Sequence, residues 1–136
     1  LKESLSVSSS VDISRSKVLL ADDLDSIREI TGIFLKRMDI DYKEAENGIE
    51  ALNMAQIEHF DLILMDVQMP RMDGLTATRK LREAGVTTPI IAMTAHAMTG
   101  HQNMCIKAGM DDTLSKPFTR KELRTVLEKW LNKDTN

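Results

Sequence analysis

The sequence predicts an α/β fold in which helices cover both faces of an open, five-stranded parallel sheet. Two observations lead to this prediction. Short runs made entirely of apolar residues recur along the chain, as in strands that are buried on both faces. Amphipathic segments lie between these runs, so that neighbouring strands begin about 20 to 28 residues apart, the length that a β-α-β crossover requires.

The strand candidates follow one another at regular intervals. Three of them are the apolar runs Val18–Ala21, Leu62–Met65 and Ile90–Met93. Two weaker candidates, Asp41–Ala45 and Asp112–Ser115, fill the remaining intervals between helical segments. Five strands are therefore expected, and the weaker two are less apolar than the other three.

The helix candidates occupy the intervals after the strands. Apolar residues recur at steps of three and four in the first and last of them, which places these residues on one helical face. The segment from Ala97 to Ala108 stops at Gly109, a residue suited to a left-handed helix cap. The expected helices contain Ile27 to Met38, Gly48 to about Glu58, Gly74 to about Glu83, Ala97 to Ala108, and Leu123 to Leu131.

Composition narrows the classes of partner and compartment. The chain has 136 residues, enough for one domain, and its net charge of −3 argues against a nucleic-acid or membrane-surface partner. Its one cysteine, Cys105, forms no internal disulfide, which indicates a reducing, cytoplasmic setting. No apolar run approaches the roughly 18 residues of a membrane span. A parent chain anchored by segments outside this sequence is compatible with these features.

The two ends of the chain differ from its middle. Residues 1–16 are rich in serine and have no apolar period, so they are interpreted as a linker. Residues 17–133 are expected to form the domain. The sequence begins at Leu1 and not at Met, which indicates a piece of a longer protein. Any output domain is expected before residue 1 or on another polypeptide.

Polar residues follow four of the predicted strands. Asp22 and Asp23 come after the first strand and Asp66 after the third, while Thr94 and Lys116 come after the fourth and fifth. In an open parallel sheet, ligands bind beyond the carboxyl ends of the strands. With the strand order 2-1-3-4-5 of flavodoxin-like, three-layer folds, these five residues meet at one small site.

This set of side chains favours one kind of chemistry. Three carboxylates repel one another unless cations are present, and Lys116 supplies only one positive charge. Oxygen ligands select a hard divalent cation, and magnesium fits best because it shares its coordination positions with water and phosphate. A carboxylate in such a site could attack a phosphoryl group to form an aspartyl phosphate.

Each of these residues also has an ordinary structural interpretation. Asp22 or Asp23 could cap a helix, Asp66 could belong to the turn that follows it, and a lone lysine is usually solvated. Thr94 could cap the helix that begins near Ala97. The occurrence of such residues at four strand ends together is what favours a functional site.

The same residues resemble the receiver (response-regulator) domains of two-component signalling systems. The matching elements are Asp22-Asp23, the stretch Asp66 to Gly74 with the sequence DVQMPRMDG, Thr94-Ala95, and Lys116-Pro117-Phe118. The resemblance covers residues 16 to 133. The stretches around Thr94 and Gly109 are similar to receivers of hybrid sensor histidine kinases, which favours a C-terminal receiver of such a kinase. A stand-alone single-domain response regulator is the alternative.

The resemblance implies a role for each residue. Asp66 is expected to accept a phosphoryl group from a phosphohistidine, carried by a histidine kinase or a histidine phosphotransfer domain. Asp22, Asp23, Asp66 and the backbone carbonyl of Gln68 are expected to bind Mg²⁺. Thr94 is expected to donate a hydrogen bond to the phosphoryl group and Lys116 to pair with it, with a cis peptide between Lys116 and Pro117.

Two positions modify this expectation. Receivers often carry Tyr or Phe three residues before the lysine, where this chain has Thr113, so an aromatic switch is not expected. His96, two residues after Thr94, is expected to be a loop residue with at most an influence on phosphate lifetime.

Other classes fit the sequence less well. A magnesium-dependent phosphohydrolase of the haloacid-dehalogenase type has a second acid two residues after its nucleophile, where this chain has Gln68. A flavodoxin-like flavin carrier needs a phosphate loop rich in Ser, Thr and Gly after the first strand, and Asp22-Asp23 would repel a flavin phosphate. A degenerate receiver that acts only as a docking module would lack some of these site residues, whereas this chain has the complete set of Asp22, Asp23, Asp66, Thr94 and Lys116.

Overall fold

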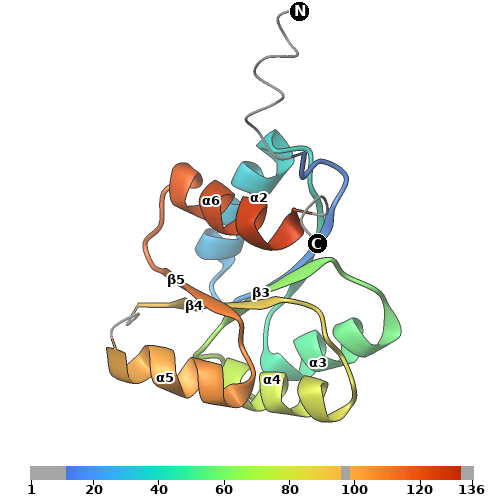
Figure 1. Ribbon diagram of the computed structural model, residues 1–136, viewed down its shortest axis with the longest axis vertical. Helices are drawn as coiled ribbons and strands as arrows, with labels where there is room; N and C mark the ends of the chain where they lie inside the picture. The colour runs from blue at the N-terminus through green and yellow to red at the C-terminus, as the bar shows by residue number, and fades with distance from the viewer. Residues whose placement is uncertain (1–11, 96–98, 133–136) are drawn as a thin grey trace, which may run out of the picture.

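Five parallel strands form the sheet at the centre of the protein (Figure 1). The computed structural model describes residues 12–95 and 99–132. Within the sheet, the strand order is β2-β1-β3-β4-β5, and every neighbouring pair is parallel. This arrangement confirms the predicted strand order. The strands are β1 Lys17–Ala21, β2 Asp41–Ala45, β3 Leu62–Asp66, β4 Ile90–Thr94 and β5 Asp112–Ser115.

Helices cover both faces of the sheet, so the molecule has three layers. In Figure 1, α2 and α6 lie above the sheet, and α3, α4 and α5 lie below it. The predicted helix start at Ala97, like His96, lies outside the described residues. The helices are α2 Asp25–Arg37, α3 Gly48–Ile57, α4 Gly74–Glu83, α5 Thr99–Ala108 and α6 Arg120–Leu131.

Side-chain caps determine where three of the helices begin. The side chains of Asn47 and Asp73 accept hydrogen bonds from backbone N–H groups in the first turns of α3 and α4. At α6, Thr119 and Glu122 form a reciprocal capping box. Such caps satisfy N–H groups that have no partner inside the helix. Helix α6 therefore begins three residues before Leu123, the first residue of its predicted apolar stripe.

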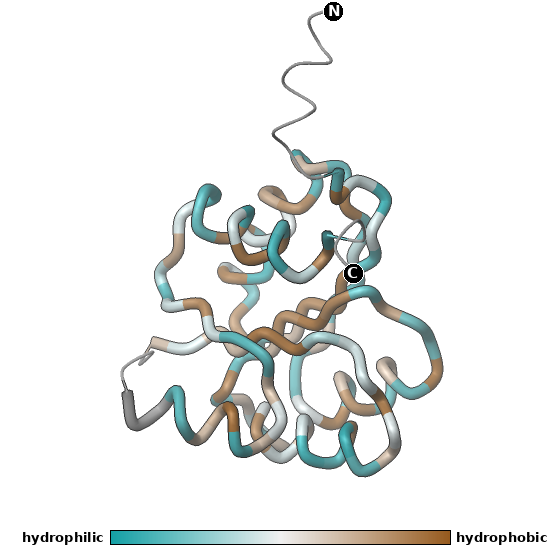
Figure 2. Tube along the Cα trace, viewed as in Figure 1, coloured by the Kyte–Doolittle hydropathy of each residue, from teal (hydrophilic) through white to brown (hydrophobic). Residues whose placement is uncertain are grey.

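The core consists of two aliphatic clusters, one on each face of the sheet. Successive residues of β1 alternate between them, with Val18 and Leu20 in the cluster beneath α2 and α6, and Leu19 and Ala21 in the other. Figure 2 shows the central strands as the most hydrophobic part of the chain. Burial on both faces explains why the central strands are apolar throughout and do not alternate with polar residues.

The described N-terminal segment joins this core. Ile13 is 3% exposed and packs in the cluster beneath α2 and α6, and Ser16 is also buried. Ile13 and Ser16 therefore pack against the domain. Residues 1–11 lie outside the described part, and the assignment of residues 1–16 as a linker stays a prediction. Among the described residues, no helix combines the length and the apolar character needed to cross a membrane.

Candidate functional site

The register of the sheet brings the predicted site residues to one edge. Ala21 of β1 pairs with Met65 of β3, so the next residues, Asp22 and Asp66, lie at the same level. Thr94 of β4 pairs with Ser115 of β5, and Lys116 follows directly. Parallel strands end at the same edge, and the side chains that follow them meet there.

Lys116 joins two of the carboxylates. Its Nζ lies 3.2 Å from Asp22 Oδ2 and 3.2 Å from Asp66 Oδ1. The side chains of Asp22 and Asp66 are 0% and 7% exposed, so both ion pairs are shielded from solvent. Asp23 is exposed, yet carboxylate oxygens of Asp22, Asp23 and Asp66 all lie within 4.8 Å of one another. The three predicted carboxylates and the predicted ammonium thus form one cluster.

A cavity of about 620 Å³ opens above this cluster. Asp66 and Lys116 lie in its wall, and Asp23 and Leu24 border it on the side of α2. Thr94, which is 5% exposed, and Gln68 also line the cavity, as the sequence predicted for a shared site. The cavity gives a ligand access to Asp66, which is otherwise buried.

The electrostatics of the cluster make the ionised form of Asp66 less favourable than it is for an aspartate in water. Burial and the charge of Asp22 raise the pKa of Asp66 to about 6, although Lys116 and the N–H of Gln68 oppose the shift. Burial alone would lower the pKa of Lys116, but attraction to Asp66 and Asp22 outweighs burial and raises it. The lysine is therefore charged at neutral pH, and it does not fully offset the mutual repulsion of the carboxylates.

The donor set of the cluster fits a hard divalent cation. Three carboxylates face one ammonium, which leaves two negative charges when all four groups are ionised. All the clustered ligand atoms are oxygens, and one carboxylate is exposed to solvent, so that bound water could complete the coordination. Magnesium prefers this combination of a few carboxylates with water.

The turn after β3 holds Asp66 in place. The N–H of Gln68 donates to Asp66 Oδ1 at 3.3 Å, and the N–H of Gly74 donates to the Val67 carbonyl at 2.9 Å. A Cβ atom at Gly74 would lie 2.1 Å from the backbone oxygen of Asp66. Only glycine allows α4 to begin this close to the strand end.

Two details inferred from the sequence can be located in the structure. The Lys116–Pro117 peptide is cis, as the resemblance implied. Thr113 lies on β5 and lines a different cavity, next to α6. The consequence of a threonine at this position for switching stays a prediction.

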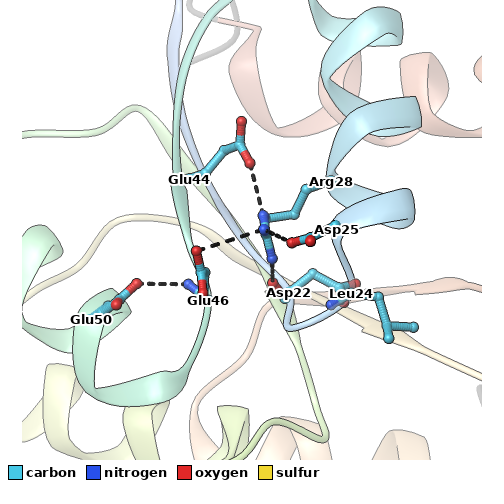
Figure 3. A network of polar contacts seen from close by, with 7 residues as sticks. All are labelled: Asp22, Leu24, Asp25, Arg28, Glu44, Glu46 and Glu50. Carbon is cyan, nitrogen blue, oxygen red and sulfur yellow. Dashed lines mark hydrogen bonds and ion pairs between the residues drawn. The ribbon is translucent and has the colours of Figure 1, made fainter.

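One residue beside the site was not predicted. Arg28 of α2 is 6% exposed, and it contacts the backbone of Asp22 and carboxylates from β2 and α2 (Figure 3). The sequence offered one weak signal, the spacing of three between Asp25 and Arg28, which allows an ion pair on a helix. Its contact with Glu44 of β2 depends on the sheet and has no local signal.

Sequence comparisons agree with this geometry. Residues 18–128 match the response regulator receiver domain. The chain is 40% identical over 119 residues to the sensor histidine kinase GacS of Pseudomonas protegens, which covers 84% of this chain and 13% of GacS. It is 36% identical over 110 residues to the sensor histidine kinase RcsC of Escherichia coli, which covers 81% of this chain and 12% of RcsC. The chain thus spans about an eighth of the length of these kinases.

Solved structures show the same fold. The receiver domain of the sensor histidine kinase PA1611 of Pseudomonas aeruginosa, with a magnesium ion coordinated in its active site cleft, aligns with a TM-score of 0.80 and 37% identity, covering 87% of this chain and 98% of that one. The receiver domain of Saccharomyces cerevisiae Ssk1, in complex with the histidine phosphotransfer protein Ypd1, aligns with a TM-score of 0.81 and 29% identity, covering 86% and 89%. In fold and sequence alike, the chain belongs to the response regulator receiver domain family.

Proposed function

We propose that this chain is the phosphoacceptor receiver of a two-component phosphorelay and that Asp66 is its phosphorylation site. The observation that carries the proposal is the position of the Asp66 carboxylate, which is buried beside Lys116 yet reachable from a cavity. A carboxylate oxygen of Asp66 would attack the phosphorus of a phosphohistidine. The phosphorus–nitrogen bond would break, and its electron pair would remain on the imidazole nitrogen of the donor.

Lys116 and Thr94 would stabilise the phosphorylated state. Lys116 already contacts Asp66 Oδ1, so its ammonium is in place to pair with a phosphoryl oxygen attached to that carboxylate. Thr94 ends β4, the strand next to β3, and lines the same cavity. Its hydroxyl would donate to the phosphoryl group. Transfer of a phosphoryl group needs little from a protein beyond this positioning and charge stabilisation.

Mg²⁺ is the cofactor that the acidic cluster would bind. Asp22, Asp23 and Asp66 would supply carboxylate oxygens, and the backbone carbonyl of Gln68 would be a further ligand. When bound, the ion would offset negative charge on the carboxylates and on the phosphoryl group. The magnesium ion in the cleft of the PA1611 receiver supports this assignment.

The parent protein is proposed to be a hybrid sensor histidine kinase. The similarity to GacS and RcsC, both named sensor histidine kinases, supports this. Residues 17–133 would form its receiver and residues 1–16 a linker. A histidine kinase domain or a histidine phosphotransfer domain would be the partner, as the Ssk1–Ypd1 complex suggests. This domain would lie in the cytoplasm.

Phosphorylation of Asp66 can be tested with a small phosphodonor and with beryllofluoride. In the presence of Mg²⁺, the wild-type domain should incorporate one phosphoryl group, and Asp66→Asn should incorporate none because an amide oxygen is a poor nucleophile. The measurement is the mass shift of the intact protein. Asp73→Asn is the matched control: Asp73 lines the same cavity, and asparagine can still cap α4. Stoichiometric labelling of Asp66→Asn would refute the assignment.

A second substitution tests the metal site. Asp23→Ala removes an exposed carboxylate from the cluster and should weaken Mg²⁺ binding about tenfold or more, because a ligand is lost while the buried part of the site is kept. Isothermal titration calorimetry measures the affinity directly. Unchanged affinity would exclude Asp23 from the site.

A further inference from the structure

Arg28 is a buried cation that contacts four residues next to the acidic cluster. One of its nitrogens, Nη1, donates to the backbone carbonyl of Asp22 at 2.7 Å, and its Nε donates to Glu44 Oε1 at 2.8 Å. Its Nη2 contacts the carboxylate of Asp25 and lies 3.8 Å from that of Glu46. Figure 3 shows the guanidinium between the α2 helix and β2, with these oxygens around it.

The charge of Arg28 is largely offset by residues outside the site. Asp25, Glu44 and Glu46 supply three carboxylates to one guanidinium, whereas Arg28 contacts Asp22 only through a backbone oxygen. Lys116, by contrast, contacts the side-chain carboxylates of the cluster directly. Arg28 therefore acts on the cluster mainly by fixing geometry and only weakly by supplying positive charge.

The contact with Arg28 completes the fixation of Asp22. The N–H of Asp22 donates to the Ala45 carbonyl at 3.1 Å, its Oδ1 accepts from the Leu24 N–H at 3.0 Å, and its Oδ2 accepts from Lys116. The carbonyl of Asp22 belongs to the peptide that leads into Asp23. With that carbonyl held by Arg28, the orientation of the peptide is restricted, and so is the direction in which the Asp23 side chain leaves the backbone.

The segment between β1 and α2 lacks one anchor that precedes other helices of this protein. The N-cap residue of α2 is Leu24, whose side chain cannot accept a hydrogen bond, so this helix lacks the side-chain cap that α3, α4 and α6 have. Arg28 instead reaches back from the second turn of α2 to the segment and connects it to edge strand β2. The loop after β2 is itself tied down, because the Glu46 N–H donates to Glu50 Oε1 at 2.8 Å.

We infer that Arg28 is a positioning residue of the metal site: by holding the Asp22 carbonyl against Glu44 of β2, it orients Asp23 to bind Mg²⁺. The inference rests on the proposed function, because it assumes that the acidic cluster binds the ion. Residues that orient metal ligands without touching the metal change its affinity when they are replaced, by about 10- to 100-fold in known sites.

The test compares Arg28→Gln with a matched control, Arg82→Gln. Arg82 is also a multiply bonded arginine, whose guanidinium donates to the carbonyls of Gly109, Val86 and Thr88 and to Asp111, in the loops that precede β4 and β5. These loops lie at the amino ends of the strands, whereas the cluster lies at the carboxyl ends. Both substitutions should lower the free energy of unfolding, but only Arg28→Gln should weaken Mg²⁺ binding, by about tenfold. Calorimetric titration with MgCl₂ and urea denaturation measure the two quantities.

Two further variants keep the inference falsifiable if Arg28→Gln folds poorly. Arg28→Lys can bond to the Asp22 carbonyl or to Glu44 but cannot span both, so its Mg²⁺ affinity should lie between those of the wild type and Arg28→Gln. Glu44→Ala leaves Arg28 in place and removes its anchor on β2, so it should weaken Mg²⁺ binding in the same direction. Combined with Arg28→Gln, it should add no further loss, since both substitutions break one connection.

The outcomes separate this inference from the proposed function. If the wild type binds Mg²⁺ and is labelled at Asp66, but Arg28→Gln and Glu44→Ala bind Mg²⁺ with wild-type affinity, Arg28 is not a positioning residue and the proposed function stands. An equal loss of affinity in Arg82→Gln would likewise overturn the inference, because general destabilisation would then explain it. If the wild type itself binds no Mg²⁺, the proposed function fails first.

Discussion

Asp66 is subject to two opposing requirements at the scale of a single side chain. A nucleophilic carboxylate must be ionised, but Asp66 is 5% exposed and lies close to Asp22, which is fully buried. Lys116 offsets part of this cost through its ion pair with Asp66. A divalent cation would offset the rest. Repulsion between the carboxylates in the metal-free site therefore favours binding of the ion.

This preference predicts a pH dependence of the metal-free domain. The pKa of Asp66 is raised from 3.8 to about 6 in the folded protein, by burial first and by Asp22 second. As the pH rises from about 4 to about 6, the unfolded chain releases this proton while the folded chain still holds it, so folding loses stability across that interval and does not regain it above pH 6. Asp66→Asn escapes this loss.

Urea denaturation in EDTA should reveal the difference. Asp66→Asn is expected to be more stable than the wild type at pH 7.5, by roughly 1 to 3 kcal/mol, and the two should have similar stability near pH 4. Saturating Mg²⁺ should shrink the difference at pH 7.5, because the ion stabilises only the ionised wild-type site. A difference that is the same at both pH values would contradict the assigned cause.

At the scale of secondary-structure elements, side chains from the ends of strands connect the layers. Trp130 of α6 donates its indole N–H to Asp112 Oδ2 of β5 at 2.8 Å, and Lys129 lies 3.4 Å from the same oxygen. This contact joins α6 to the strand that leads to Lys116 four residues later. The position of α6 and that of the site lysine therefore depend on the same short strand.

Substitution of Asp112 tests this connection. Asp112→Ala should lower the free energy of unfolding by about 1 kcal/mol, because the indole N–H loses its acceptor. Asp112→Asn keeps an acceptor and should lose less. Trp130 is the only tryptophan, so its fluorescence reports the change, and Asp112→Ala should shift the emission to longer wavelength. Unchanged emission in Asp112→Ala would show that the indole finds another environment of equal polarity.

The same contact also has a pH dependence. Burial alone would raise the pKa of Asp112, but hydrogen bonds from Trp130 and from the Thr113 N–H, together with Lys129, outweigh burial and lower it. The stabilisation that Asp112 provides is thus present above its unfolded pKa and is lost as the pH falls through the lowered folded value.

In the molecule as a whole, the sheet separates two apolar clusters, and the site lies at the end of the sheet between them. β1, β3 and β4 carry most of the fully buried residues, whereas β2 is largely exposed and pairs only with β1. The site lies where the three central strands and β5 end, so the rigid part of the molecule holds Asp22, Asp66 and Thr94. Asp23 and the segment before α2 depend on the edge strand through Arg28.

Hydrogen exchange can test this division. Backbone amides in β1, β3 and β4 should exchange most slowly, at rates near those set by global unfolding, and amides in β2 and at the start of α2 should exchange faster. Mass spectrometry of peptic fragments provides the measurement. Mg²⁺ should slow exchange at the start of α2 more than in β3, because the ion would fix the segment that carries Asp23. Exchange in β2 as slow as in β3 would contradict the division.

The fold and the members of the acidic cluster could be predicted from local patterns in the sequence. Apolar runs such as Leu62–Met65 mark strands buried on both faces, and the spacing between runs leaves room for one helix each, so the topology has few alternatives. Because parallel strands end at one edge, Asp22, Asp66 and Lys116 were expected to meet, and the structure places them in ion-pair contact. These inferences succeed because periodicity and strand order are encoded locally.

The residues that support the cluster could not be predicted in this way, because their contacts form between elements of the folded protein. Arg28 gains its importance from Glu44, which is 16 residues away in sequence and is brought close by the pairing of β1 with β2. The burial of Ile13, the hydrogen bond between Asp112 and Trp130, and the close approach of Gly74 to the Asp66 carbonyl likewise arise from packing between elements. The contacts between side chains of different elements depend on the register of the sheet and on how the helices pack against it. Neither of these produces a local pattern in the sequence.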